Sequence, residues 1–163
     1  MVKTNVTTMK QLGIIADLPE LYQWVKKHQQ IMTPTISRYA QGRKELWIKR
    51  KCSLQKNPVI SQGYFDARLY RLANTVLPNF DIGLFLYYPP NTQITPHKDH
   101  FVFNNGAVLI NLGDAIFVHD GREYSLTDGA VWQFDCKVTH AIKPVHKDRY
   151  SFIFWTLNPS FRK

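Results

Sequence analysis

The stretch IGLFLYYPPNTQITPHKD, residues 82–99, decides the fold expected for this chain. It begins with an unbroken run of aliphatic and aromatic residues, as a buried strand does, and it ends in a shorter and more polar run. The turn signal Pro89-Pro90-Asn91 separates the two runs. Short strands joined by such turns are typical of an all-β sandwich or barrel.

The same pattern continues to residue 157. The turn signals NNG, LGD, HDG and TDG separate six further short runs: AVLINL (107–112), AIFVHD (115–120), EYSL (123–126), GAVWQF (129–134), THAIKP (139–144) and YSFIFWTL (150–157). With the first two runs they make eight predicted strands, the number found in a jelly roll, which is the architecture of cupin-like folds.

The residues before Pro78 have a helical pattern instead. A helix is expected from Leu18 to about Gln30, with Asp17 as its N-cap. A second helix is expected over Tyr64–Val76, where apolar residues recur at helical spacing and Pro78 ends the run. The sequence therefore predicts an α+β, mainly β fold: a double-stranded β-helix with N-terminal helices packed on one sheet.

A length of 163 residues suits one domain with a real core. We expect a single domain over residues 1–163, with a helical and basic N-terminal support region (1–78) and a jelly-roll core (79–158). No apolar stretch approaches the roughly 18 residues of a membrane helix, the first residues lack the apolar run of a secretory signal, and Cys52 and Cys136 are too few for a disulfide framework. These features favour a cytoplasmic protein without a membrane partner, and they leave its oligomeric state open.

Positive charge is in excess, with 21 Lys and Arg against 12 Asp and Glu. The segment Arg38–Lys51, RYAQGRKELWIKRK, is rich in this charge, contains Glu45 as its one acid, and interleaves Tyr39 and Trp47. Basic and aromatic side chains together suit a phosphate backbone and stacked bases. The segment is therefore a possible nucleic-acid contact, although a basic, solvated surface without such a partner explains the charge as well.

Two residues in the second predicted strand indicate a metal site. His97 and Asp99 are two positions apart, so both side chains point to one face of a strand. His140 begins the seventh predicted strand, which a jelly roll can place beside the second. Two histidines and one carboxylate on one face of Fe(II) leave three positions open, enough for a chelating keto acid and O2. His97, Asp99 and His140 are therefore the candidate metal ligands and catalytic residues.

The last predicted strand carries a candidate carboxylate site. Arg149 and Ser151 share one face of it, and arginine grips a carboxylate with two parallel hydrogen bonds, to which a serine hydroxyl can add a third. A surface arginine paired with Asp148 is the alternative. Because the strand is otherwise apolar, an inward charge at Arg149 would require an anionic partner.

The order His97-x-Asp99, His140, Arg149-x-Ser151 resembles the signature of the 2-oxoglutarate/Fe(II) oxygenase superfamily, and the resemblance extends over residues 81–158. Within that superfamily the sequence is most similar to AlkB-type proteins. The stretches that carry this likeness are Tyr88-Pro89-Pro90, Ile110-Asn111-Leu112-Gly113-Asp114 with Ile116-Phe117, Asp128-Gly129-Ala130-Val131-Trp132 and His140-Ala141-Ile142-Lys143-Pro144.

The resemblance implies Fe(II) as the metal, with 2-oxoglutarate and O2 as cosubstrates. By the same likeness Tyr88 binds the distal carboxylate of 2-oxoglutarate beside Arg149, with Tyr87 as the competing candidate. The implied reaction is hydroxylation with release of succinate and CO2, and it becomes oxidative demethylation when the hydroxylated carbon is attached to nitrogen. Halogenation is not favoured, because Asp99 stands where halogenating relatives have a small residue.

Two positions depart from the AlkB pattern. Leu86 stands where that pattern has an asparagine, and Trp155 stands where it has a second arginine for the metal-proximal carboxylate. The substrate is therefore left between an alkylated nucleic-acid base and, as the alternative, a protein side chain, peptide or small molecule. A non-catalytic, metal-binding cupin-like module is a lesser alternative.

Five other candidates are expected to have structural roles. His119 and His146 are expected to be exposed at strand ends, while His100 alternates away from the metal face. Cys136 is expected to be a plain thiol in a turn, and Trp132, like Trp155, to pack in the core.

Overall fold

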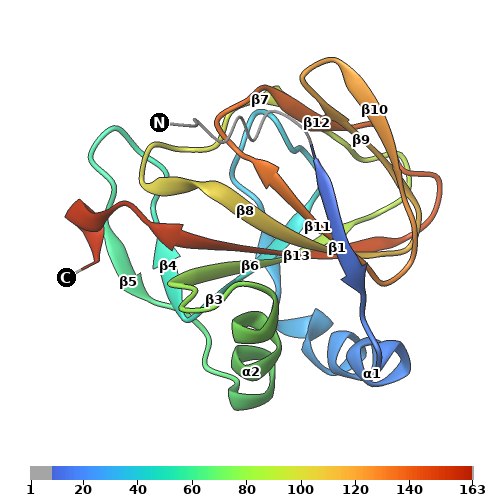
Figure 1. Ribbon diagram of the computed structural model, residues 1–163, viewed down its shortest axis with the longest axis horizontal. Helices are drawn as coiled ribbons and strands as arrows, with labels where there is room; N and C mark the ends of the chain where they lie inside the picture. Colours follow the sequence, from blue (N-terminus) through green and yellow to red (C-terminus); the bar gives the residue numbers. More distant parts are fainter. Residues whose placement is uncertain (1–8, 163) are drawn as a thin grey trace.

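Two antiparallel sheets dominate the computed structural model, which describes residues 9–162 (Figure 1). In that range the larger sheet has seven strands, in the order β1 (Lys10–Ile14), β11 (Ala130–Asp135), β8 (Phe103–Leu112), β13 (Arg149–Leu157), β6 (Ile82–Tyr88), β3 (Lys44–Ile48) and β2 (Thr33–Pro34). The smaller sheet has four, in the order β10 (Arg122–Leu126), β9 (Ala115–His119), β12 (His140–Ile142) and β7 (Ile94–His97). A separate pair, β4 (Arg50–Cys52) and β5 (Ile60–Gln62), extends from the far end of β3. The predicted jelly roll is confirmed, and its eight strands are β6 to β13.

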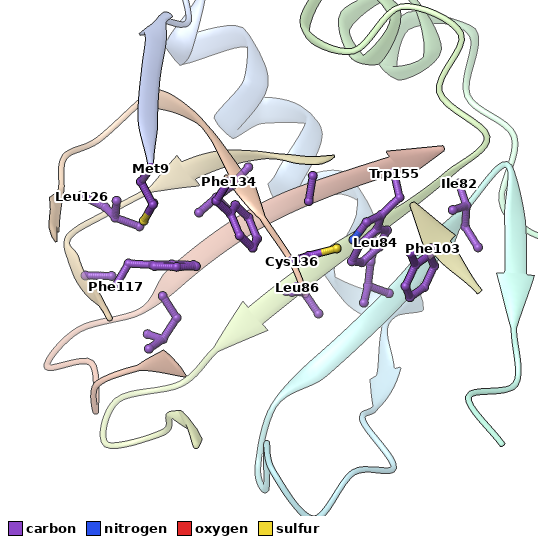
Figure 2. Packing of buried hydrophobic residues seen from close by; sticks show 14 of the residues in the cluster. Met9, Ile82, Leu84, Leu86, Phe103, Phe117, Leu126, Phe134, Cys136 and Trp155 are labelled. Carbon is purple, nitrogen blue, oxygen red and sulfur yellow. The ribbon is translucent and has the colours of Figure 1, made fainter. Parts of the chain in front are cut away.

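The side chains of the larger sheet divide between two cores with a period of two. On β13, Ser151, Ile153 and Trp155 face the smaller sheet, whereas Phe152 and Phe154 face the helices. Figure 2 shows the first core, between the sheets. Both faces of β13 are covered, so both sets of alternating side chains are buried. The sequence of β13 is therefore almost continuously apolar.

The second core lies under α1 (Leu18–His28) and α2 (Ala67–Val76), which cover one face of the larger sheet (Figure 1). Trp24 of α1 packs its ring 5.2 Å from that of Phe85 and 5.5 Å from that of Phe152. Asp17 accepts a hydrogen bond from the Glu20 backbone at 3.4 Å, as expected of the N-cap. Short 3-10 turns follow at Gln29–Ile31 (η1) and Pro159–Phe161 (η2). The described helices are all too short or too polar to span a bilayer.

The second helix begins three residues later than predicted. Tyr64 is extended instead, because its N–H donates to the Trp47 carbonyl and its own carbonyl accepts from Lys49, both at 2.9 Å. Asp66 then caps the helix by accepting a hydrogen bond from the Leu69 backbone at 2.8 Å. The residues before Pro78 also contribute β1, β2 and β3 to the larger sheet, so they supply strands as well as helices to the same layers.

Candidate active site

Three side chains from the smaller sheet and the loop after β7 converge at one point. His97 ends β7, His140 begins β12, and the two residues are paired in register. Oδ1 of Asp99 lies 3.0 Å from Nε2 of His140 and 3.4 Å from Nε2 of His97. The potential ligand atoms of all three residues lie within 4.8 Å of one another. The structure thus brings the three predicted ligands close enough together to hold one metal ion.

The two imidazoles are oriented by backbone carbonyls. Nδ1 of His97 donates to the carbonyl of Thr95, and Nδ1 of His140 donates to the carbonyl of Val138, each at 2.8 Å. This arrangement assigns the proton of a neutral ring to Nδ1 and leaves the lone pair on Nε2, the atom that faces the other two ligands. The donor set of two such nitrogens and a carboxylate fits Fe(II) with three open positions.

The carboxyl of Asp99 is held in its charged form. Burial acts to raise the pKa of Asp99, but His140 and His97, which donate from Nε2 to the carboxylate when their rings are protonated, outweigh burial and place the pKa below its usual range. Burial correspondingly acts to lower the pKa of His140, and the hydrogen bond with Asp99 reverses this, so the pKa is raised. A carboxylate rather than a carboxylic acid is therefore available to a cation.

Trp155 contacts this carboxylate directly. Its indole Nε1 donates a hydrogen bond to Oδ2 of Asp99 at 3.1 Å, while its ring stacks on Phe103 with centroids 4.1 Å apart. The core position predicted for Trp155 is confirmed, since the side chain is buried. What the sequence did not indicate is that the residue at the expected place of a second arginine instead donates a hydrogen bond to Asp99.

A cavity of about 700 Å³ connects this cluster with the carboxylate site predicted on β13. All six residues singled out from the sequence line it: Tyr88, His97, Asp99, His140, Arg149 and Ser151. Apolar side chains from both sheets, among them Leu109, Phe134 and Ile142, also line it.

Arg149 is buried at this cavity with part of its hydrogen-bonding capacity unused. It is 1% exposed, and its Nε donates to Oδ1 of Asn111 at 2.8 Å. Nη1, Nη2 and the Ser151 hydroxyl are buried without a hydrogen-bond partner in residues 9–162. Burial lowers the pKa of Arg149 and nearby Arg43 lowers it further, against the opposing effect of Tyr88. A buried cation with two free donors matches a carboxylate ligand.

The positions of Tyr87, Tyr88 and Asp148 decide between the alternative roles that the sequence left open for the tyrosines and for Arg149. Tyr88 lines the cavity, with the guanidinium of Arg149 4.7 Å above its ring, whereas Tyr87 points to the opposite face of β6. The Tyr87 hydroxyl donates to Asp148 at 2.7 Å. The interpretation of Arg149 as a surface arginine paired with Asp148 is therefore wrong.

Arg43 is a cavity residue that sequence reasoning placed only in the basic segment. It is 7% exposed, its Nη1 donates to the Tyr88 hydroxyl at 3.1 Å, and its Nε donates to Oγ1 of Thr35 at 3.2 Å. Glu45 and Trp47 line the cavity as well. The spacing of Arg43, Glu45 and Trp47 at alternate positions is the one signal that could have separated them from their exposed neighbours.

The residues interpreted as structural have mixed outcomes. His119 was predicted to be exposed and is fully buried, because β9 is covered by Phe134 and the His119 ring hydrogen-bonds to the Asp135 carbonyl. His146 is exposed as predicted. Cys136 is a buried thiol that donates to the Asn104 carbonyl, and burial raises its pKa.

Among comparisons with known proteins, only the comparison with solved structures finds similar proteins. No protein-family model matches the chain, and no curated protein matches it in sequence. A prolyl hydroxylase from Trichoplax adhaerens, solved with a hypoxia inducible factor peptide fragment, is similar with a TM-score of 0.71 and 15% identity, over 97% of this chain and 87% of that one.

Two further solved structures are similar over most of their length. OsALKBH1 has a TM-score of 0.65 and 11% identity, over 91% of this chain and 97% of that one. A 2OG-Fe(II) oxygenase family oxidoreductase from Burkholderia pseudomallei has a TM-score of 0.61 and 15% identity, over 90% and 84%. The chain therefore has the fold of the 2-oxoglutarate/Fe(II) oxygenases, with an AlkB-like protein among its structural neighbours.

Proposed function

We propose that this protein is an Fe(II)- and 2-oxoglutarate-dependent dioxygenase that hydroxylates or oxidatively demethylates its substrate, with release of succinate and CO2. One observation carries the proposal. The buried guanidinium of Arg149, with two donors free, lies in the same cavity as a cluster of two histidines and one aspartate. A dicarboxylate that chelates a metal through one end and meets an arginine at the other accounts for both features.

The chain's residues have distinct roles in this proposal. His97, Asp99 and His140 hold the iron, while Arg149 and Tyr88 bind the distal carboxylate of 2-oxoglutarate with a contribution from Ser151. Iron, 2-oxoglutarate and O2 together supply the oxidising chemistry, and the protein supplies position and charge. The apolar side chains that line the cavity suit the methylene groups of 2-oxoglutarate and exclude water from them.

An alkylated nucleic-acid base is the substrate that we propose first. Arg38, Lys51 and Lys98 are exposed at the cavity, and Tyr39 packs 5.7 Å from the His97 ring, where it could stack on a base brought to the metal. The alternative is a protein side chain, peptide or small molecule. One support for this alternative is the similarity to a prolyl hydroxylase that was solved with a peptide. The other is Glu45, which lines the cavity and whose carboxylate would repel phosphate groups.

Direct binding of 2-oxoglutarate tests the proposal. Calorimetric titration without O2 into protein loaded with Mn(II), which does not turn over, should give saturable binding. Arg149→Ala should weaken binding at least about tenfold, because a charge-assisted hydrogen bond contributes about 1.5–3 kcal/mol. Arg122→Ala, on the exposed start of β10, removes an equal charge away from the cavity and should bind normally. Equal affinity of the wild type and Arg149→Ala would overturn the assignment.

A further inference from the structure

Arg43 and Arg149 both lie against the side chain of Tyr88. Arg43 directly precedes β3 and Arg149 begins β13, the two strands that flank the Tyr88 strand β6. The guanidinium carbon of Arg149 is 4.7 Å from the centroid of the Tyr88 ring, and that of Arg43 is 5.5 Å from it. Neither arginine forms an ion pair with an acidic side chain of residues 9–162. Two largely buried positive charges therefore meet at the Tyr88 side chain with no acid at ion-pair distance, an arrangement that favours an anionic ligand. Glu45, in the same cavity, interacts with Arg43 only at longer range.

The register of the sheet explains why Arg43 points inward. Lys44, the first residue of β3, is paired with Tyr87 of β6, so Arg43 is opposite Tyr88. Because side chains alternate, Arg43 and Tyr88 point to the cavity, whereas Lys44 is exposed. Thr35 accepts from Nε of Arg43 and so fixes the guanidinium from its other side.

The hydrogen bond from Arg43 to the Tyr88 hydroxyl oxygen determines where the hydroxyl proton of Tyr88 can point. A phenol oxygen carries a single proton and can accept as well as donate. Nη1 of Arg43 occupies an acceptor position at 3.1 Å, and the hydroxyl proton of Tyr88 has no acceptor among the described residues. This proton is thus free to be donated to an oxygen of a ligand held by Arg149.

We infer that Arg43 is a positioning residue for the cosubstrate: it orients the Tyr88 hydroxyl so that this group donates to the distal carboxylate of 2-oxoglutarate. The inference rests on the proposed function and extends it to a residue outside the jelly-roll core. It also assigns Arg43, part of the basic segment, to the cosubstrate and not to a phosphate backbone.

A double-mutant cycle tests the inference, with calorimetric titration of 2-oxoglutarate into the full-length, Mn(II)-loaded protein. Arg43→Met should weaken binding about tenfold, which is the effect of one charge-assisted hydrogen bond. In the Tyr88→Phe background, which has no hydroxyl to orient, the same change should alter affinity by less than about twofold. Lys44→Met, which removes the neighbouring exposed charge, should bind as the wild type does.

A second ligand separates positioning from general damage. 2-Oxopentanoate has the same chain length as 2-oxoglutarate but lacks the distal carboxylate, so Arg43→Met should bind it with unchanged affinity. If Arg43→Met does not fold, Arg43→Lys repeats the cycle, because lysine keeps the charge but lacks the planar geometry that contacts Thr35 and Tyr88 together.

Three results would overturn the inference. The first is an unchanged affinity of the Arg43 variant for 2-oxoglutarate, and the second is an equal loss of affinity for 2-oxopentanoate. The third is a double variant whose loss of affinity equals the product of the two single losses, which would show that Arg43 and Tyr88 act independently. Failure of the wild type itself to bind 2-oxoglutarate would instead overturn the proposed function, and the inference with it.

Discussion

The indole Nε1 of Trp155 donates a hydrogen bond to Oδ2 of Asp99, across 3.1 Å, from the larger sheet to the loop after β7. Oδ1 of the same carboxylate faces the two histidines. The indole thereby fixes which oxygen of Asp99 is directed at the proposed metal site. Partners of this kind orient ligands and tune a site without touching the metal.

Removal of this hydrogen bond should weaken metal binding. We predict that Trp155→Phe keeps the ring stacked on Phe103 and lowers metal affinity about 10–100-fold, the range typical for loss of such a partner. Competition between the protein and a chelator for Co(II) or Mn(II) measures the effect. Trp132→Phe is the matched control, because the indole Nε1 of Trp132 has no partner among residues 9–162. Equal losses in both variants would contradict the assigned role.

Asn111 should control the orientation of Arg149. Its Oδ1 accepts from Nε of Arg149 at 2.8 Å, and its amide donates to the carbonyls of Gly113 and Thr127. Asn111→Ala should therefore weaken 2-oxoglutarate binding about tenfold and destabilise the fold by about 1–3 kcal/mol, because buried polar groups lose their partners.

Asn104→Ala provides the control for this prediction. Asn104 lies on the same strand and donates to Thr156 and Leu157, away from Arg149. Urea denaturation and calorimetric titration should show destabilisation without a loss of affinity. If both asparagine variants changed the affinity alike, Asn111 would have no specific effect on Arg149.

Asp66 should be important for the helical layer. Its Oδ1 caps α2 and its Oδ2 accepts from the indole of Trp24 at 2.9 Å, which links the two helices. Asp66→Ala should lower the free energy of unfolding by about 2–3 kcal/mol, the combined effect of a lost cap and a lost hydrogen bond. Asp17→Ala removes only an exposed cap and should cost less than about 1 kcal/mol. A urea unfolding series that ranked the two in the opposite order would be inconsistent with this role.

The exposed basic side chains at the cavity predict salt-dependent binding of single-stranded oligonucleotides. Gel shifts should show affinity that falls as salt rises from 50 to 200 mM, because bound phosphates release counterions. Lys51→Ala and Lys98→Ala should each weaken binding and reduce the salt slope by about one. The absence of binding even at low salt would exclude a nucleic-acid substrate and favour a peptide or small molecule.

The sequence predicted the eight strands of the jelly roll because their apolar runs are long and their turns are marked by Gly, Asn and Pro. It also predicted that the side chains of His97 and Asp99 lie together. The expected reason, alternation along one strand, is wrong, because β7 ends at His97 and Asp99 lies in the loop after it, with its Oδ1 3.4 Å from Nε2 of His97. Strand β1 was not predicted, because it is short and its only large apolar residues are Leu12 and Ile14, both of them exposed.

The remaining site residues depend on contacts between distant segments. Arg43 looks like one more basic residue of its segment until the pairing of β3 with β6 places it against Tyr88. Trp155 and Asp99 are 56 residues apart, and local sequence does not indicate which tryptophan will meet which acid. The prediction that His119 is exposed was wrong for the same reason, because the residue that covers it, Phe134, lies on the distant strand β11.

Succinate formation tests the central claim most directly. Aerobic incubation of the Fe(II)-loaded protein with 2-oxoglutarate and candidate substrates should yield succinate and CO2 in equal amounts, even if slowly without the true substrate. Asp99→Ala, which lacks the carboxylate ligand, should reduce succinate to the level of iron in buffer. Formation of succinate that depends on both iron and Asp99 is the predicted result. No succinate above that background with any substrate, or an equal yield from Asp99→Ala, would contradict the account.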